Sequence, residues 1–190
     1  MLPLLWSILF YLWFASEILI ALLTRTRRQN TSASIQDRGS MLILWLVIFS
    51  SITACEWISA ATQPTPALTN PWIHPLALIT ITLGLAIRFI SVFSLGKAFS
   101  ANVAIRASQT LNTTGLYRLV RHPSYLGLVL IFLAVGLHSR HALSLFLAVV
   151  PPTAALLYRI HIEELALNSA FGPEYALYSA RTKRLLPGIY

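Results

Sequence analysis

The chain has 190 residues, of which 56% are hydrophobic and only 11% are charged, and its mean hydropathy is +0.70. A soluble domain carries about one quarter charged residues, so this composition excludes an ordinary soluble protein and predicts an integral membrane protein. The formal net charge of +8 would suggest nucleic acid as the partner of a soluble protein. Here the basic residues flank apolar segments, which favours a lipid bilayer with anionic head groups and no nucleic-acid partner.

Five apolar stretches reach or approach the length that a bilayer requires of a helix, about 20 residues. They cover residues 2–23, 41–61, 75–95, 124–138 and 142–160, and the fourth is short on its own. We therefore predict an all-α fold, a single integral membrane domain over residues 1–190 with five transmembrane helices. Pro151 and Pro152 are expected to kink the fifth helix, because each proline removes a backbone donor.

A helical tail is predicted to follow the fifth span. Apolar side chains recur at helical spacing over residues 162–166, and Gly172-Pro173 favours a helix end followed by a new start. In the next segment, EYALYSARTKR, Tyr175 and Tyr178 share one face of the predicted helix. We expect this segment to form an interfacial helix at the membrane surface.

Basic residues are distributed unevenly among the connecting segments. Of the 14 lysines and arginines, only Arg88 lies deep within a span, and only Arg140 lies in the loops that follow spans two and four. The others occupy the first loop, the third loop and the chain from the end of span five onward. Because loops rich in basic residues stay in the cytoplasm, we predict an N-terminus outside and a cytoplasmic C-terminus.

Ionisable residues within or near the predicted spans have structural as well as functional interpretations. Arg88 either snorkels, pairs with Glu17 at a similar depth or serves a reaction, and we favour pairing. Arg159 and Glu163 lie four residues apart on one helix, the spacing of an ordinary ion pair. Four further polar residues are expected near the outer surface: Glu56, His74, His138 and His141. No metal site is predicted, because no spacing typical of metal ligands recurs.

Two polar blocks in the C-terminal half carry the strongest functional signal. The first is GLYR at 115–118 with RHPSYLG at 121–127, and the second is EELALNSAFGPEYALYSARTKRLLP at 163–187. In this order, separated by a helical hairpin, they resemble the isoprenylcysteine carboxyl methyltransferase family over about residues 96–187. The match weakens at residues 102–106, and Lys183 departs from the usual tail. The glycine-rich fingerprint of a Rossmann domain does not occur in the sequence.

The resemblance implies a membrane-embedded methyltransferase that uses S-adenosyl-L-methionine. Its substrate would be the carboxylate of an isoprenylated cysteine or a similar amphiphile, methylated at the cytoplasmic face. The resemblance further implies two catalytic residues, with Glu163 facing the cofactor and Arg159 binding the substrate carboxylate. Besides Glu163, it implies a cofactor pocket lined by Gln109, Thr110, Leu111, Asn112, Tyr117, His122, Pro123, Ser124 and Tyr125.

These residue types suit methyl transfer, which needs aligned reactants and exclusion of water. A carboxylate nucleophile is already ionised at neutral pH and needs no strong base. Two alternatives remain open. One is N-methylation of a phospholipid or another lipid amine, with Glu163 or His122 as the base. The other is a small membrane scaffold or transporter, although the polar residues gather at one face rather than at the midplane.

Overall fold

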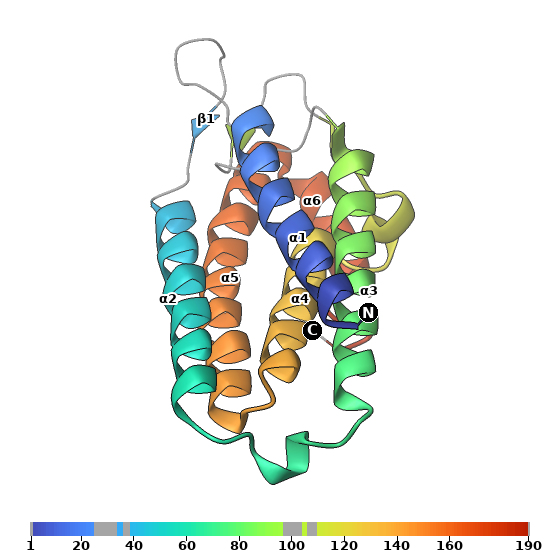
Figure 1. Cartoon of the computed structure of the whole chain (residues 1–190). Coiled ribbons are helices and arrows are strands. Elements are labelled where there is room, and N and C mark those ends of the chain that lie inside the picture. Colours follow the sequence, from blue (N-terminus) through green and yellow to red (C-terminus); the bar gives the residue numbers. More distant parts are fainter. Residues whose placement is uncertain (1, 25–33, 36–38, 97–103, 106–109, 190) are drawn as a thin grey trace.

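The structure is a computed structural model that describes residues 2–24, 34–35, 39–96, 104–105 and 110–189 (Figure 1). Most of these residues are helical, which confirms the all-α prediction. The α-helices are α1 (Leu2–Thr24), α2 (Ser40–Ala61), α3 (Ile73–Leu95), α4 (Pro123–Ser139), α5 (Ala142–Phe171) and α6 (Pro173–Arg181). Two short 3₁₀ helices, η1 (Pro66–Leu68) and η3 (Gly115–Arg118), lie in the connections. β1 (Ser34–Ile35) and β2 (Ala104–Ile105) form a two-residue antiparallel pair, with Ser34 opposite Ile105.

The first five helices form the predicted membrane bundle. α1, α2, α3 and α5 are each long and apolar enough to cross a membrane. α4 is a shorter apolar helix of 17 residues, about 25 Å long, slightly less than the roughly 30 Å of hydrocarbon in a bilayer. α1 through α4 begin within two residues of the predicted starts. The five-span prediction is therefore confirmed, and the chain is an integral membrane protein.

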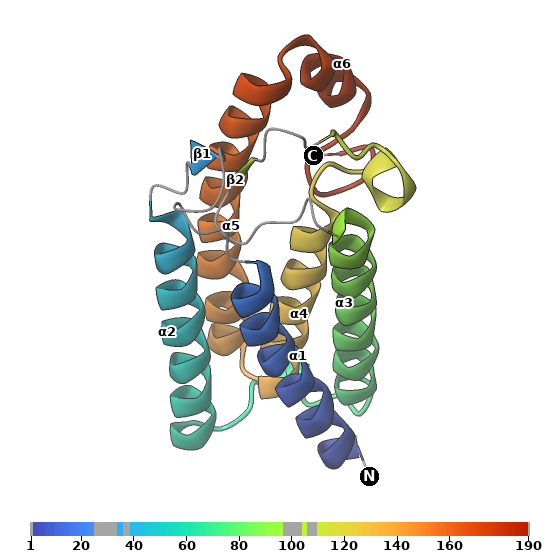
Figure 2. The ribbon, with the colours of Figure 1, turned by 90° about the horizontal axis from the view of Figure 1, so that it is seen from above.

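α5 joins the predicted fifth span and the predicted helical segment after it in one helix. It begins at Ala142, contains Pro151 and Pro152, and ends at Phe171, where Gly172-Pro173 predicted a helix end. Its 30 residues measure about 45 Å, so about a third of the helix stands beyond the hydrocarbon core. Figure 2 shows this end of α5 passing the ends of α3 and α4 to meet α6. α5 therefore carries polar residues both at the end of the bundle and beyond it.

Four helix pairs hold the bundle together: α3 with α4, α2 with α5, α4 with α5, and α1 with α3. α3 and α4 approach most closely at Gly84 and Gly127, where a Cβ added to Gly127 would lie 2.7 Å from the Gly84 carbonyl oxygen. Small residues allow such close contact between helices in a membrane. α2 packs along α5, and the Cys55 thiol donates to the Ser144 carbonyl oxygen at 3.2 Å. α1 packs on α3, which places Glu17 beside Arg88. This arrangement brings the ends of α3, α4 and α5 together at the site.

The tail helix α6 begins at Pro173, directly after Gly172, which has a positive φ of 49° that favours glycine, as the Gly-Pro pair predicted. Tyr175 and Tyr178 share a face as expected, with ring centroids 6.2 Å apart. That face turns inward, because Tyr175 is buried and the Tyr178 hydroxyl donates to the Tyr117 carbonyl oxygen at 2.7 Å. The tyrosine face of α6 therefore closes the site described below.

Candidate active site

The RHPSY segment lies where η3 leads into α4. Pro123 occupies the first turn of α4, a position that suits proline because the missing N–H would have no helical partner. Just upstream, the Asn112 side chain accepts a hydrogen bond from the Thr114 N–H at 3.0 Å, an Asx turn. The Asn112 amide also donates to the Ser94 carbonyl oxygen at 3.1 Å, which ties this loop to α3.

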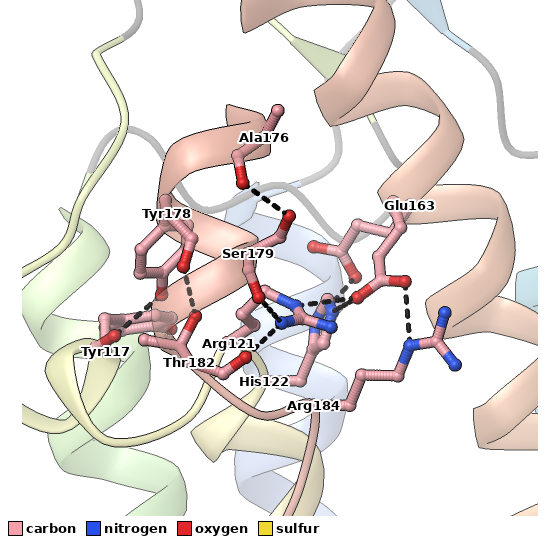
Figure 3. Close-up of polar contacts among 10 residues, drawn as sticks. Tyr117, Arg121, His122, Glu163, Ala176, Tyr178, Ser179, Thr182 and Arg184 are labelled. Carbon is pink, nitrogen blue, oxygen red and sulfur yellow. Dashed lines mark hydrogen bonds and ion pairs between the residues drawn. The ribbon is translucent and has the colours of Figure 1, made fainter. Parts of the chain in front are cut away.

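The C-terminal tail is bound to the RHPSY segment (residues 121–125) by main-chain hydrogen bonds and by the side chain of Arg121, whose bonds Figure 3 shows. The Arg121 N–H donates to the Lys183 carbonyl oxygen at 2.7 Å, and the His122 N–H donates to the Arg184 carbonyl oxygen at 3.0 Å. The Arg121 guanidinium adds bonds to the carbonyl oxygens of Ser179, at 2.9 Å, and of Thr182. Two segments some 60 residues apart in the sequence therefore form one wall.

Glu164 is the ionic centre of this wall. One carboxylate oxygen accepts from Arg121 Nε at 2.9 Å, and the other accepts from Arg184 Nε at 2.9 Å. His122 Nε2 lies 3.5 Å from the same carboxylate. A carboxylate that accepts several charge-assisted bonds is held firmly in place. Glu164 therefore fixes the end of α5 to both the RHPSY segment and the tail.

Glu163, the neighbour of Glu164, points in a different direction and lines a cavity of about 710 Å³. We call it the polar cavity. Glu163 Oε2 lies 3.8 Å from His122 Nδ1, and it has no hydrogen-bond partner among the described residues. The Tyr175 hydroxyl in the same wall is likewise buried without a described partner. The cavity therefore presents an acceptor and a phenol group for which the described residues supply no partner.

The polar cavity is lined by most of the residues predicted to bind a cofactor. Pro123 is buried at the start of α4 behind the lining, and Gln109 lies outside the described residues. The structure adds Leu95, Arg121, Leu167, Tyr175 and Tyr178 to the lining. For the two tyrosines, the sequence signal was the spacing that places them on one face of a helix. The predicted residues in the lining are Thr110, Leu111, Asn112, Tyr117, His122, Ser124, Tyr125 and Glu163.

Two tyrosines of the polar cavity remain neutral phenols. Burial raises the pKa of Tyr117 well above its usual range, and the nearby Glu163 carboxylate raises it further. Burial also raises the pKa of Tyr178 to about 12. Neutral phenol rings offer flat apolar faces and a hydroxyl donor, which suits contact with an adenine or ribose. The lining therefore combines ring faces with one carboxylate, Glu163.

A second cavity of about 540 Å³ lies deeper in the bundle, between α1, α2, α4 and α5. We call it the apolar cavity, because most of its wall comes from side chains such as Leu44, Ile48 and Leu128. Arg159 lies at its polar end. Arg159 is 3% exposed, and its guanidinium donates to the Tyr125 hydroxyl and to Ser40 Oγ, each at 3.0 Å. The helix α5 thus turns Arg159 toward the apolar cavity and Glu163 toward the polar one.

Glu17 and Arg88 form the paired charges that the sequence analysis favoured. Arg88 Nε and one terminal nitrogen donate to the two carboxylate oxygens of Glu17, each at 2.8 Å. Both residues are buried and line the apolar cavity. Arg88 also donates to the hydroxyl of Ser124, the residue before Tyr125. The predicted pairing is confirmed, and the pair joins α1 and α3 to the first turn of α4.

Tyr125 lines both cavities, so the polar and apolar cavities meet at this side chain. Its ring stacks on His122, with centroids 5.7 Å apart, and its hydroxyl accepts from Arg159. A polar molecule in one cavity and an amphiphile in the other could therefore approach each other beside Tyr125. Among the described residues, no group of three or more His, Cys, Asp or Glu side chains comes together as a metal site would require.

Comparison with known proteins supports the family resemblance. Residues 77–169 match the family model described as the isoprenylcysteine carboxyl methyltransferase (ICMT) family. The protein-S-isoprenylcysteine O-methyltransferase A of Arabidopsis thaliana is 31% identical over 110 residues, 57% of this chain and 56% of that protein. A probable protein-S-isoprenylcysteine O-methyltransferase of Oryza sativa subsp. indica is 26% identical over 181 residues, 94% of this chain and 92% of that protein.

A relative with another name shows that acceptors differ among similar proteins. The methanethiol S-methyltransferase 2 of Bradyrhizobium diazoefficiens is 34% identical over 137 residues, 67% of this chain and 52% of that protein. The chain thus spans about half the length of this relative and of the Arabidopsis protein. The family match covers α3 through most of α5, including the RHPSY segment, Arg159 and Glu163. Residues 77–169 of the chain are therefore similar to the isoprenylcysteine carboxyl methyltransferase family.

Proposed function

We propose that the chain transfers the methyl group of S-adenosyl-L-methionine to the carboxylate of a prenylated cysteine or a similar amphiphile. The observation that carries the proposal is the meeting of two unlike cavities at Tyr125. A polar cavity with ring faces and a carboxylate suits the methyl donor. An apolar cavity with a guanidinium at its polar end suits an acceptor that has an acidic head and a greasy tail. The match of residues 77–169 to the family model supports the same reaction.

The polar cavity suits the donor because two of its polar groups, on Glu163 and Tyr175, have no hydrogen-bond partner among the described residues. Glu163 Oε2 would accept from the ammonium of the donor, and the Tyr175 hydroxyl would bond its carboxylate or ribose. Tyr117 and Tyr178 would contact the adenosine. When bound, the donor supplies a methyl group on a positively charged sulfur. The residues of this chain hold it, orient it and exclude water from it.

Arg159 would hold the acceptor. One carboxylate oxygen of the substrate would bond the guanidinium, and the other would attack the methyl carbon in line with the carbon–sulfur bond. The carbon–oxygen bond of the ester would form as the carbon–sulfur bond of the donor broke, and the electron pair of the broken bond would stay on sulfur. Tyr125 and Ser40, which accept from Arg159, would keep the guanidinium plane fixed during this displacement.

The two reactants would reach the site from different phases. The distribution of basic residues supports an active site at the cytoplasmic face, with the N-terminus outside. A water-soluble donor would then enter from the cytoplasm beside the tail, and the prenyl tail would lie within the bundle. Cysteines introduced at residues 35 and 68 are expected to react with an impermeant thiol reagent from opposite sides of the membrane.

The decisive experiment measures which acceptor gains a labelled methyl group. Purified protein is given S-adenosylmethionine with a labelled methyl and N-acetyl-S-farnesylcysteine, with the matching cysteine amide as the control acceptor. We expect a product that releases labelled methanol in alkali, as a methyl ester does, and no product from the amide. Transfer to the amide, or a product stable to alkali, would contradict carboxyl methylation.

A second candidate is methylation of a thiol. The observation in its favour is the 34% identity to a protein named for methanethiol, over 67% of this chain. A free thiol is largely protonated at neutral pH and would need a base, for which Glu163 or His122 would serve. The same assay with an alkanethiol, and with phosphatidylethanolamine for the lipid-amine alternative, distinguishes these acceptors, because neither product releases methanol in alkali.

A further inference from the structure

A third cavity lies at the end of the bundle opposite the active site. This far cavity has about 1060 Å³ of space, open at its mouth, between α1, α2 and α4. Phe10, Ile52 and Val135 line it, one from each helix. It lies on the same helix faces as the apolar cavity, whose wall includes Trp13, Ile48 and Leu128 from the same three helices. The two cavities therefore follow one another along the bundle.

Only side chains separate the two cavities. Trp13 is 1% exposed and packs edge to face against Phe132, with ring centroids 6.2 Å apart and planes at 80°. Phe132 and Ile48 are buried, and both line a small cavity of about 190 Å³ between α2, α4 and α5. Ile48 also lines the apolar cavity, and Ile52, a third residue of the small cavity, also lines the far cavity. Truncating one of the large rings in this partition of side chains would therefore connect the spaces on its two sides.

We propose that Trp13, supported by Phe132, forms the floor of the acceptor site and limits the length of the apolar tail that the enzyme accepts. The inference rests on the proposed function, which fixes the acceptor head at Arg159. A tail that starts beside Tyr125 runs down the apolar cavity and meets the partition at Phe132, seven residues further along α4. Seven helical residues correspond to about 10 Å. Val135 and His138, which line the far cavity, lie one and two turns beyond.

The floor gives tail length an energetic consequence. A tail that is too long for the cavity must fold back or leave part of its surface outside, and so loses burial of its last isoprene unit. In a hydrophobic pocket, one methylene that does not fit lowers kcat/KM by about tenfold or more relative to the substrate that fits. We therefore expect the wild-type protein to use farnesylcysteine in preference to geranylgeranylcysteine, which is one isoprene unit longer.

The test compares the ratio of kcat/KM for geranylgeranyl- and farnesylcysteine between variants. Trp13→Leu removes the floor, and the ratio is expected to rise by about tenfold. Leu128→Phe narrows the cavity above the floor, and the preference is expected to move toward tails shorter than farnesyl. Trp57→Leu is the matched control, because Trp57 is 72% exposed on α2 and lines none of these three cavities. Its ratio should equal that of the wild type.

Calorimetry measures the affinities of geranyl-, farnesyl- and geranylgeranylcysteine, and so tests the limit on tail length without depending on turnover. An unchanged ratio and an unchanged order of affinities in folded Trp13→Leu and Leu128→Phe would show that the tail leaves the bundle sideways, and would overturn the proposal. Absence of methyl transfer to every carboxylate, together with the expected shift in the order of affinities, would contradict the proposed function alone. If Trp13→Leu does not fold, the opposite shift in Leu128→Phe decides the question.

Discussion

The polar and apolar cavities share Tyr125 but differ in where their walls come from. The polar cavity is built from the end of α3, the RHPSY segment, the end of α5 and α6, and most of these residues lie within the family match. The apolar cavity takes most of its wall from α1 and α2, which precede residue 77 and lie outside the match. Under the proposed function, the polar cavity would bind a methyl donor common to these proteins, and the apolar cavity would bind the acceptor. This division would fit relatives whose names specify different acceptors.

The largest expected effect comes from Arg159, the guanidinium at the polar end of the apolar cavity. Arg159→Lys keeps the charge but replaces a planar two-pronged donor with a mobile point charge. Misplacing a reacting group by about 1 Å lowers a rate by on the order of a hundredfold, and we expect a loss of kcat of that size. The affinity for S-adenosylhomocysteine, measured by calorimetry, should stay unchanged.

The matched control for this variant is Arg181→Lys. Arg181 is exposed at the end of α6 and lines neither cavity, so its substitution should leave the rate unchanged. Near-normal turnover of Arg159→Lys on the prenylated cysteine would mean that another group holds the carboxylate. Loss of cofactor affinity in the same variant would show that the two cavities do not act separately.

Glu163 should show the reverse pattern. Glu163→Gln keeps the shape of the side chain but removes the charge that would bind the donor ammonium. Hydrogen bonds to charged groups contribute about 1.5–3 kcal/mol, so S-adenosylhomocysteine should bind roughly ten- to a hundredfold more weakly. Calorimetry measures the change, and Glu174→Gln on the exposed side of α6 serves as the control. An unchanged affinity would remove Glu163 from the donor site.

Much of the fold around the two cavities could be predicted from the sequence, but the different roles of neighbouring residues could not. Span lengths, the Gly172-Pro173 break and the Arg88–Glu17 pair follow from hydropathy, backbone chemistry and the cost of burying charge. Helical periodicity places Tyr175 and Tyr178 on one face, but the partner of that face depends on how the tail folds back onto Arg121.

The end of α5 shows why the rest could not be predicted. The sequence predicted a span to residue 160 and a helical segment up to Gly172, but not the partners of the charges beyond the span. Arg121 and Arg184, both distant in sequence from the span, bind Glu164. Consecutive residues on a helix differ by about 100° in direction, so Glu163 and Glu164 face different surroundings. Their sequence alone does not show which of them faces the cavity.

Glu164 is expected to affect stability more directly than chemistry. Glu164→Gln removes the charge that Arg121 and Arg184 share, and it leaves two guanidinium groups without their carboxylate. Leaving such groups poorly satisfied costs about 1–3 kcal/mol, which thermal unfolding in detergent would detect as a lower Tm. Arg184→Gln should cost less, because the Arg184 side chain is 37% exposed and water can replace it. Equal losses in both variants would contradict Glu164 as the shared centre.

The smallest effect is expected at Lys183, the residue that departs from the usual tail of the family. Its contact with the RHPSY segment is made by the main chain, because its carbonyl oxygen accepts from the Arg121 N–H at 2.7 Å. The residue is exposed, and the wall does not depend on its side chain. Lys183→Ala should therefore change the free energy of unfolding by no more than about 0.5 kcal/mol and leave cofactor affinity unchanged. A measurable loss of S-adenosylhomocysteine affinity would place the Lys183 side chain in the donor site, and the polar cavity would then extend further along the tail than its lining shows.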